Sequence, residues 1–373
     1  MSADAIEFHP IGGAFTSGLT KAAVKVTEVT GGPKGFSALL YQCPMNVDWD
    51  GAPFAYGLDN PADASVPLQV KGGNVVLGNL GDGRGMVWNS KKQEYEHDPQ
   101  DHFQRNLKPI EHRGLGGSLR DATDNKKGKG LFIDHDFVWT GVKSVKPDDP
   151  DVKMYGLWLD QRDALKDKFG RFPVIQKDGS SKGYYLSTSG SAAISAAAQK
   201  ANAGWQYQQS SYWDASKVPY CVWPSLLGHG VRLGDFGLVI RHRTGRSCGF
   251  FFADTGSTTK LGECSGYLVT RVAGSPLDNN DKVSFVVFPM SGSGSAQQGQ
   301  DLQVRSAVMA QIAKLSGVPN AEELIAFLAM EANPDKKGSL LPLPGSRAAA
   351  YDNILRALKE WGFKTARQPI NVR

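Results

Sequence analysis

The sequence has few cysteines and no long hydrophobic run. Four of its 373 residues are cysteine, and no two of them have CxxC spacing, so we expect no structural zinc site. No apolar run approaches the roughly 18 residues that a membrane-spanning helix needs. Residues 1–19 lack a charged stretch followed by an apolar core, so we predict that there is no classical signal peptide.

The chain also lacks a basic stripe with interleaved aromatic residues. Its net charge is only +5, and we interpret the cluster of Lys126, Lys127 and Lys129 as a solvated loop. We therefore do not expect nucleic acid as a partner. The glycine-rich stretch 81–85 has neither a phosphate-loop lysine nor GxGxxG spacing, so we interpret it as a turn and predict no cofactor.

The composition favours β structure. Hydrophobic residues make up 40% and charged residues 21% of the chain, as in a globular protein, and 43 glycines and 20 prolines indicate many turns. The length permits two domains, or one large β domain with appendages. We predict a mainly β (α+β) chain with this organisation: an N-terminal lead-in at 1–34, a catalytic domain at 35–290 with a polar insertion at 91–130, a flexible Gly/Ser/Gln linker at 291–300, and a helical module at 301–373.

The helical module follows from a change of period after the linker. Apolar residues recur at helical spacing in the first segment, which Gly317 ends. Asn320 and Glu323 have the spacing of a capping box for a second helix, and Ser346 is the predicted cap of a third helix that stops at Gly362. The residues that we expect on the apolar face of the first helix are Val304, Val308, Ile312 and Leu315.

Histidines and carboxylates are numerous in the polar insertion. His97, His102 and His112 lie among acidic residues, which invites a metal hypothesis. None of the three has HxxxH or HxH spacing to another, so we interpret this segment as a surface insertion and predict no metal site.

One stretch, residues 250–265, carries the strongest functional signal. Its first part belongs to the apolar run 249–253, which has the length and aromatic content of a strand. The run stops at Asp254-Thr-Gly, a turn signal. A polar loop follows, and Glu263 begins the next segment. In a strand–loop–strand arrangement, Asp254 and Glu263 stand at the two feet of one loop.

Two carboxylates beside one cleft are what glycosidic bond cleavage requires. An inverting enzyme separates them by about 6.5–9.5 Å and a retaining enzyme by about 5–5.5 Å. The spacing of Asp254 and Glu263 is compatible with both. The alternative is structural, with Asp254 starting a turn and Glu263 at the surface. The sequence offers no Gly-x-Ser-x-Gly elbow for a serine hydrolase.

Two of the cysteines, Cys248 and Cys264, bracket this stretch and could lie on neighbouring strands. They could form a disulfide in an oxidising compartment. The alternative is two separate reduced thiols.

Five motifs occur in an order that resembles glycoside hydrolase family 75, the chitosanase family. Together they cover roughly residues 40–275. They are Asp48-Trp-Asp-Gly-Ala-Pro-Phe-Ala-Tyr56, Gly183-Tyr-Tyr-Leu-Ser-Thr-Ser189, Val218-Pro-Tyr220, Gly230-Val-Arg-Leu-Gly-Asp235, and Ala253-Asp-Thr-Gly256 continuing through Lys260-Leu-Gly-Glu-Cys-Ser265.

The resemblance implies an inverting glycosidase acting on a β-1,4-linked amino-sugar polysaccharide. Its essential carboxylates fall on Glu263, which we predict to be the acid, and Asp254, the base. Asp48, Asp50 and Asp235 match family positions and could be subsite carboxylates or anchors of turns. The predicted substrate-binding residues are Asp48, Asp50, Tyr184, Tyr220, Asp235 and Lys260.

The Ala253-Asp-Thr-Gly stretch is also similar to the aspartate motif of membrane-bound lytic transglycosylase A and related double-psi β-barrel proteins. In that family a single aspartate does the acid work, so Asp254 would act alone. This resemblance implies a six-stranded, double-psi-type barrel as the core of the catalytic domain.

Three features depart from the chitosanase pattern. Its members are typically exported, whereas we see no export signal, and residues 82–130 and the helical tail are additional. Chitosan is a polycation, so a protein of charge +5 suits the carboxylates of peptidoglycan better. We therefore expect an effector-type enzyme that is secreted or delivered without a classical signal and acts outside the producing cytoplasm, with a secretion or immunity partner at the C-terminal helices. The other class is a non-catalytic glycan-binding or interaction protein.

Overall fold

The computed structural model describes a subset of the chain. The described residues are 5–48, 50–53, 91–92, 186–205, 208–224, 228–256, 258–275, 280–292, 301–318, 320–330 and 345–364. Between residues 56 and 185 it adds the backbone of short strands: β6 (Tyr56–Leu58), β7 (Val70–Lys71), β8 (Asn74–Asn79), β9 (Met86–Asn89), β10 (Glu94–His97), β11 (Trp139–Gly141), β12 (Leu159–Asp160), β13 (Phe172–Pro173) and β14 (Tyr184–Tyr185).

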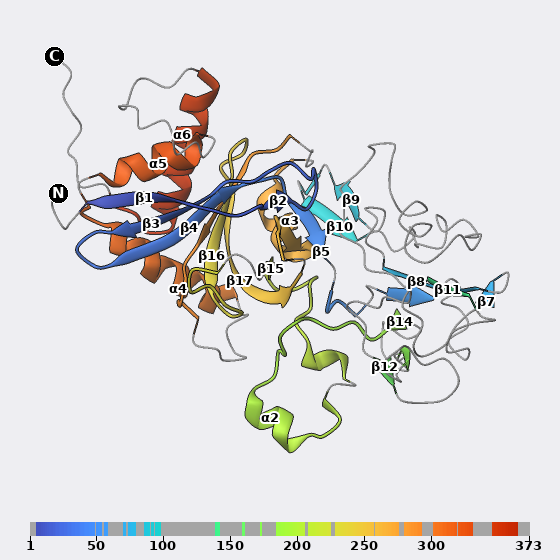
Figure 1. Ribbon diagram of the computed structural model, residues 1–373. Coiled ribbons are helices and arrows are strands. Elements are labelled where there is room, and N and C mark those ends of the chain that lie inside the picture. The colour runs from blue at the N-terminus through green and yellow to red at the C-terminus, as the bar shows by residue number, and fades with distance from the viewer. Residues whose placement is uncertain are drawn as a thin grey trace, which may run out of the picture. The chain divides into compact units, whose positions relative to one another are not determined.

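The described residues form a nine-stranded mixed sheet (Figure 1). From β1 to β17 in the strand order, neighbours are antiparallel, and β15 then runs parallel to β17. The order is β1 (Ile6–Ile11), β3 (Val26–Gly31), β4 (Phe36–Gln42), β20 (Val283–Val287), β16 (Phe236–Arg241), β17 (Ser247–Thr255), β15 (Tyr220–Trp223), β19 (Glu263–Ser265) and β5 (Asn46–Asp48).

The central strands are mostly apolar and are buried along most of their length. Every residue of β16 and of β20 is buried, as is β17 from Gly249 to Asp254. A continuous apolar run is what a strand covered on both faces requires. The predicted strand at 249–253 is confirmed by β17, and the apolar segments 36–43 and 283–288 form β4 and β20.

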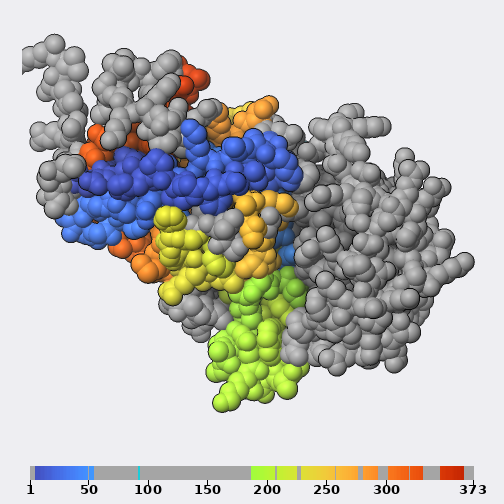
Figure 2. Space-filling model, in the orientation of Figure 1, coloured from blue at the N-terminus to red at the C-terminus, as the bar shows by residue number. Residues whose placement is uncertain are grey.

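The sheet is open, so the predicted closed double-psi-type barrel is wrong. No described strand pairing joins β1 at one end of the order to β5 at the other. The outer side of β1 is largely exposed, and Figure 2 shows this edge of the sheet as a dark-blue band on the surface. A barrel buries its inner face against its own far wall, whereas this sheet buries apolar residues against helices. The prediction of a mixed chain with helices near the C-terminus is confirmed.

Three helices follow the sheet: α4 (Asp301–Ile312), α5 (Ala321–Ala329) and α6 (Gly345–Glu360). Helix α4 packs against β16 and β17. Gly249 makes this possible, because a Cβ there would lie 3.0 Å from both Val304 Cγ1 and Trp361 Cη2. The indole Nε1 of Trp361 donates to Ser247 Oγ at 2.9 Å. The helices are thus packed onto the sheet.

The predicted apolar face of the first helix is confirmed, since Val304, Val308 and Ile312 are buried.

The predicted capping box of Asn320 and Glu323 is wrong. Asn320 precedes α5 but makes no side-chain cap bond, because its carboxamide instead accepts from Ile6 N at 2.9 Å and donates to Ile6 O at 3.0 Å. Asn320 thereby satisfies the backbone of edge strand β1. Phe327 of α5 stacks on Phe8 of β1 with ring centroids 4.9 Å apart, and Figure 1 shows α5 beside β1.

The chain divides into two compact units. The first contains residues 1–45, 219–263 and 268–373, and the second contains 46–218 and 264–267. The C-terminal helices fall in the first unit with most of the sheet. Residues 293–300 of the predicted linker, and most of the predicted insertion at 91–130, lie outside the described residues.

The remaining elements are short. They are β2 (Thr16–Ser17), which pairs in parallel with β18 (Lys260–Leu261), the helices α2 (Ala196–Ala201) and α3 (Gly266–Ala273), and the 3₁₀ turns η3 (Gln209–Ser211) and η6 (Ala313–Leu315). None of the helices in the described part of the chain has the length and apolar character needed to cross a membrane.

A buried polar network joins the sheet to the end of α5. His242 Nε2 lies 2.7 Å from Ser284 Oγ, which donates to Leu328 O at 2.9 Å. Gln42 Nε2 donates to Ser284 Oγ at 3.0 Å and to Met330 O at 2.9 Å. Burial, with the nearby charge of Lys282 as a smaller cause, lowers the pKa of His242 to about 4.

This histidine predicts a loss of stability in acid. The unfolded imidazole takes up its proton near pH 6.5 and the folded one only near pH 4, so the unfolded state binds more protons between these values. The contribution of about 3 kcal/mol to the free energy of unfolding is present above pH 6.5 and lost as the pH falls to 4. Urea unfolding of the wild type and of His242→Gln between pH 7 and 4 should give curves whose difference changes by about this amount. Exposed His9→Gln is the control, and equal pH slopes for wild type and His242→Gln would contradict the prediction.

Candidate functional site

Asp254 stands at the end of the buried strand β17, directly after a β-bulge. Strand β15 pairs Cys221 with Phe252 but Val222 with Asp254, so Ala253 is the extra residue. A bulge turns the following side chain to a new direction and is frequent beside active sites. Asp254 is 8% exposed, and its Oδ1 accepts from Thr255 N at 2.6 Å. The carboxylate is therefore held at the point where the sheet gives way to an exposed loop.

The chain returns from this loop through β18 to Glu263. Lys260, the first residue of β18, is half-buried and pairs with Thr16 of β2. Glu263 is half-buried and begins β19. The predicted strand–loop–strand arrangement is confirmed, with β18 as an additional short strand inside the loop.

Gly256 allows the two ends of this loop to lie close together. A Cβ at Gly256 would lie 3.2 Å from Glu263 Oε2 and 2.7 Å from Val222 Cγ1. Gly256 N also donates to Trp223 O at 3.3 Å. The carboxylate of Glu263 thus lies beside Gly256, two positions after Asp254. The two predicted catalytic residues stand at the two ends of one loop, although β15 lies between their strands in the sheet.

Asp235 is an anchor of two loops. It is fully buried, and its carboxylate accepts from Arg232 N at 3.0 Å, Met290 N at 3.0 Å and Gly292 N at 2.8 Å. Burial raises the pKa of Asp235, against the lowering effect of these three N–H donors. Of the two alternatives from the sequence, these bonds favour the structural anchor.

The two tyrosines that we predicted to bind substrate lie on different strands. Tyr220 has no exposed surface and lies on β15, between β17 and β19 in the strand order. Prolines bound this short strand, which is interior to the sheet. Tyr184 lies on β14 opposite Gly57, and its side chain is outside the described residues. Their roles in substrate binding stay predictions.

Asp48 and Asp50 lie in the second compact unit and share one turn. Both are buried, and Asp48 Oδ1 accepts from Asp50 N at 2.8 Å. Carboxylate oxygens of the two residues lie within 4.8 Å of each other, a spacing at which they could share a hard cation such as Ca²⁺. Carboxylate proximity alone does not define a metal site.

Gln209 is a polar residue beside this turn that the sequence analysis missed. Its Nε2 donates to Gly51 O at 2.7 Å. A single glutamine in a short 3₁₀ turn has neither periodicity nor a motif, so the sequence contains no signal that could have indicated it.

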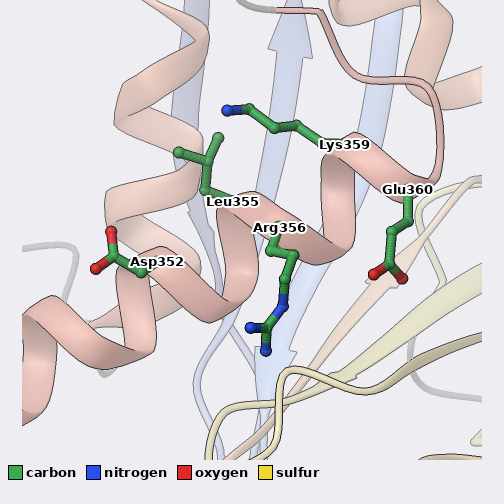
Figure 3. Close-up of a pocket in the computed structure, with 5 residues that line it drawn as sticks. All are labelled: Asp352, Leu355, Arg356, Lys359 and Glu360. Atoms are coloured by element: carbon green, nitrogen blue, oxygen red, sulfur yellow. The ribbon is translucent and has the colours of Figure 1, made fainter.

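A surface hollow of about 460 Å³ lies on α6, apart from these residues. Its lining consists of Asp352, Leu355, Arg356, Lys359 and Glu360. Figure 3 shows these side chains spreading away from one helix and not converging on a common point. This hollow therefore does not resemble a site for chemistry.

None of the four cysteines forms a disulfide, so the alternative of a Cys248–Cys264 disulfide is wrong and the alternative of separate thiols is confirmed. Burial raises the pKa of Cys248 to about 12. A thiol that stays protonated is a poor nucleophile.

Comparisons with models of known protein families and with curated proteins find no match to this chain. The resemblance to the chitosanase family therefore stays a prediction.

The substitution Gly256→Ala tests how closely Gly256 packs against Val222 and Glu263. The added methyl group would meet Val222 Cγ1 and Glu263 Oε2, so we expect a loss of about 1–3 kcal/mol in the free energy of unfolding, measured by urea unfolding. Gly12→Ala is the matched control, because a Cβ at Gly12 meets nothing within 4 Å. Equal midpoints for the two variants would show that this contact is loose.

Proposed function

We propose that the protein is a glycoside hydrolase that cleaves β-1,4 bonds of an amino-sugar polysaccharide. The observation that carries the proposal is the placement of Asp254 and Glu263 at the two ends of one loop, with Glu263 Oε2 next to Gly256. Two carboxyl groups, one acid and one base, are the minimum that this cleavage of a glycosidic bond needs.

Glu263 is the general acid and Asp254 the general base. In the inverting reaction the acid protonates the leaving oxygen while the base takes a proton from a water that attacks the opposite face of the sugar. Asp254 suits the second role, because a carboxylate whose Oδ1 accepts a main-chain N–H is held in one orientation and has its other oxygen available to take a proton. Half-buried Glu263 retains access to the leaving group.

The substrate class follows from charge. The protein carries +5, which opposes a polycation such as chitosan and favours the peptide carboxylates of peptidoglycan. We propose a cell-wall glycan strand as the preferred substrate, and an enzyme that is secreted or delivered to act outside the producing cytoplasm. A secretion or immunity protein is the proposed partner of the C-terminal helices.

A second candidate is a transglycosylase-like reaction that uses Asp254 alone. The different burial of the two carboxylates supports this single-aspartate reaction, since Asp254 is buried whereas Glu263 is half-exposed. A non-catalytic glycan-binding protein is the remaining alternative, and the two experiments below separate the three.

The substrate prediction is tested with purified glycans. Incubation with peptidoglycan and, separately, with chitosan should release sugars faster from peptidoglycan, as measured by chromatography and mass spectrometry. Sugar release from chitosan alone would refute the cell-wall substrate but not the glycosidase. Binding to either polymer without release would favour the non-catalytic alternative.

Isosteric substitutions test the two carboxylates. Asp254→Asn and Glu263→Gln should each lower kcat by at least about 100-fold, with an unchanged circular dichroism spectrum. Asp352→Asn and Glu360→Gln, on the exposed face of α6, are the matched controls and should retain activity. If Glu263→Gln keeps most of the activity while Asp254→Asn loses it, the single-aspartate reaction is correct. If both variants stay active, the site assignment is wrong.

A further inference from the structure

The turn that carries Asp48 and Asp50 has an unusually close backbone approach. Gly51 follows Asp50 with φ of +81°, and a Cβ at this position would lie 1.9 Å from Trp213 O. Only glycine fits such a contact. This close contact and the hydrogen bond from Asp50 N to Asp48 Oδ1 fix the local path of the chain. The backbone N–H and C=O groups of Gly51 still need hydrogen-bond partners.

The hydroxyl of Ser187 and the carboxamide of Gln209 are the hydrogen-bond partners of the Gly51 backbone. Gly51 N donates to Ser187 Oγ at 2.8 Å, and Gly51 O accepts from Gln209 Nε2 at 2.7 Å. Gln209 also donates to Ser187 O and accepts from Ser187 N, both at 2.9 Å. One side chain therefore bonds two backbone segments that are far apart in the sequence.

The chemistry of these contacts requires an amide at position 209. Both Nε2 hydrogens have carbonyl acceptors, Gly51 O and Ser187 O, and Oε1 has an N–H donor. Glutamate has nearly the same shape but would place a carboxylate oxygen against the two carbonyl oxygens. Loss of both donors beside buried acceptors breaks the connection without removing volume.

We propose that Gln209 is the positioning residue of the Asp48–Asp50 turn. Its carboxamide fixes Gly51, and through Gly51 the directions of two carboxylates that bind hydroxyl and amino groups of the sugar. This inference rests on the proposed function, because it assigns a task to Asp48 and Asp50 within the same glycan-binding activity. Gln209 itself does not act on the glycosidic bond.

The test compares Gln209→Glu with Gln199→Glu. Gln199 is a chemically matched control, since its Nε2 donates a single bond to Ile194 O at 3.1 Å and does not contact the turn. We expect Gln209→Glu to raise KM for the glycan about tenfold or more while kcat stays within about threefold. Amide hydrogen exchange of the peptide that covers residues 46–52, followed by mass spectrometry, should accelerate about tenfold or more. The control should change neither quantity.

A double-mutant cycle with Asp50→Asn distinguishes positioning from general destabilisation. If Gln209 acts through the turn, Gln209→Glu adds little to the KM of Asp50→Asn, whereas independent effects multiply. If Gln209→Glu does not fold, Ser187→Ala removes the acceptor of Gly51 N and serves in its place.

The outcomes separate this proposal from the proposed function. Unchanged exchange at residues 46–52 in Gln209→Glu overturns the positioning role whether or not the protein cleaves glycans. Accelerated exchange with unchanged KM overturns the link to substrate. A wild-type protein that cleaves no glycan refutes the proposed function, and the exchange measurement then still decides whether Gln209 holds the turn.

Discussion

Close packing along strand β17 is the constraint on which the rest of the first unit depends. The strand is buried from Gly249 to Asp254. At its beginning, the missing side chain of Gly249 admits Val304 and Trp361 from the C-terminal helical region. At its end, the bulge at Ala253 shifts the register with β15 directly before the buried Asp254. A well-packed interior resists displacement, so the same strand that receives the helices also gives a carboxylate a fixed position.

In both compact units, hydrogen bonds between side chains and backbone fix a carboxylate or the turn that carries it. In the first unit, Asp235 ties two loops together through three backbone N–H groups. In the second unit, Gln209 and Ser187 hold the turn that carries Asp48 and Asp50. Each case uses hydrogen bonds between backbone and side-chain groups, which are stronger where water is excluded. Carboxylates placed in this way lose little entropy on binding a ligand, and this is what the proposed glycosidase requires of them.

The errors of prediction have a common physical origin in contacts distant in sequence. Asn320 has the spacing of a helix cap, but edge strand β1 offers its backbone at Ile6, and Asn320 bonds there. A closed barrel was predicted from a short resemblance, whereas the apolar surface of the sheet is covered by helices and its edges stay separate.

The sequence by itself determined the local elements. Apolar runs fixed β4, β17 and β20, helical spacing fixed the buried face of α4, and turn residues separated Asp254 from the segment that begins with Glu263, because these signals depend only on neighbouring residues. Only the tertiary structure decided that the sheet is open, that Asp235 is an anchor and that Gln209 bonds Gly51. Each of these depends on groups that are far apart in the chain and meet only when the fold has formed, as Gln209 and Gly51 do across 158 positions.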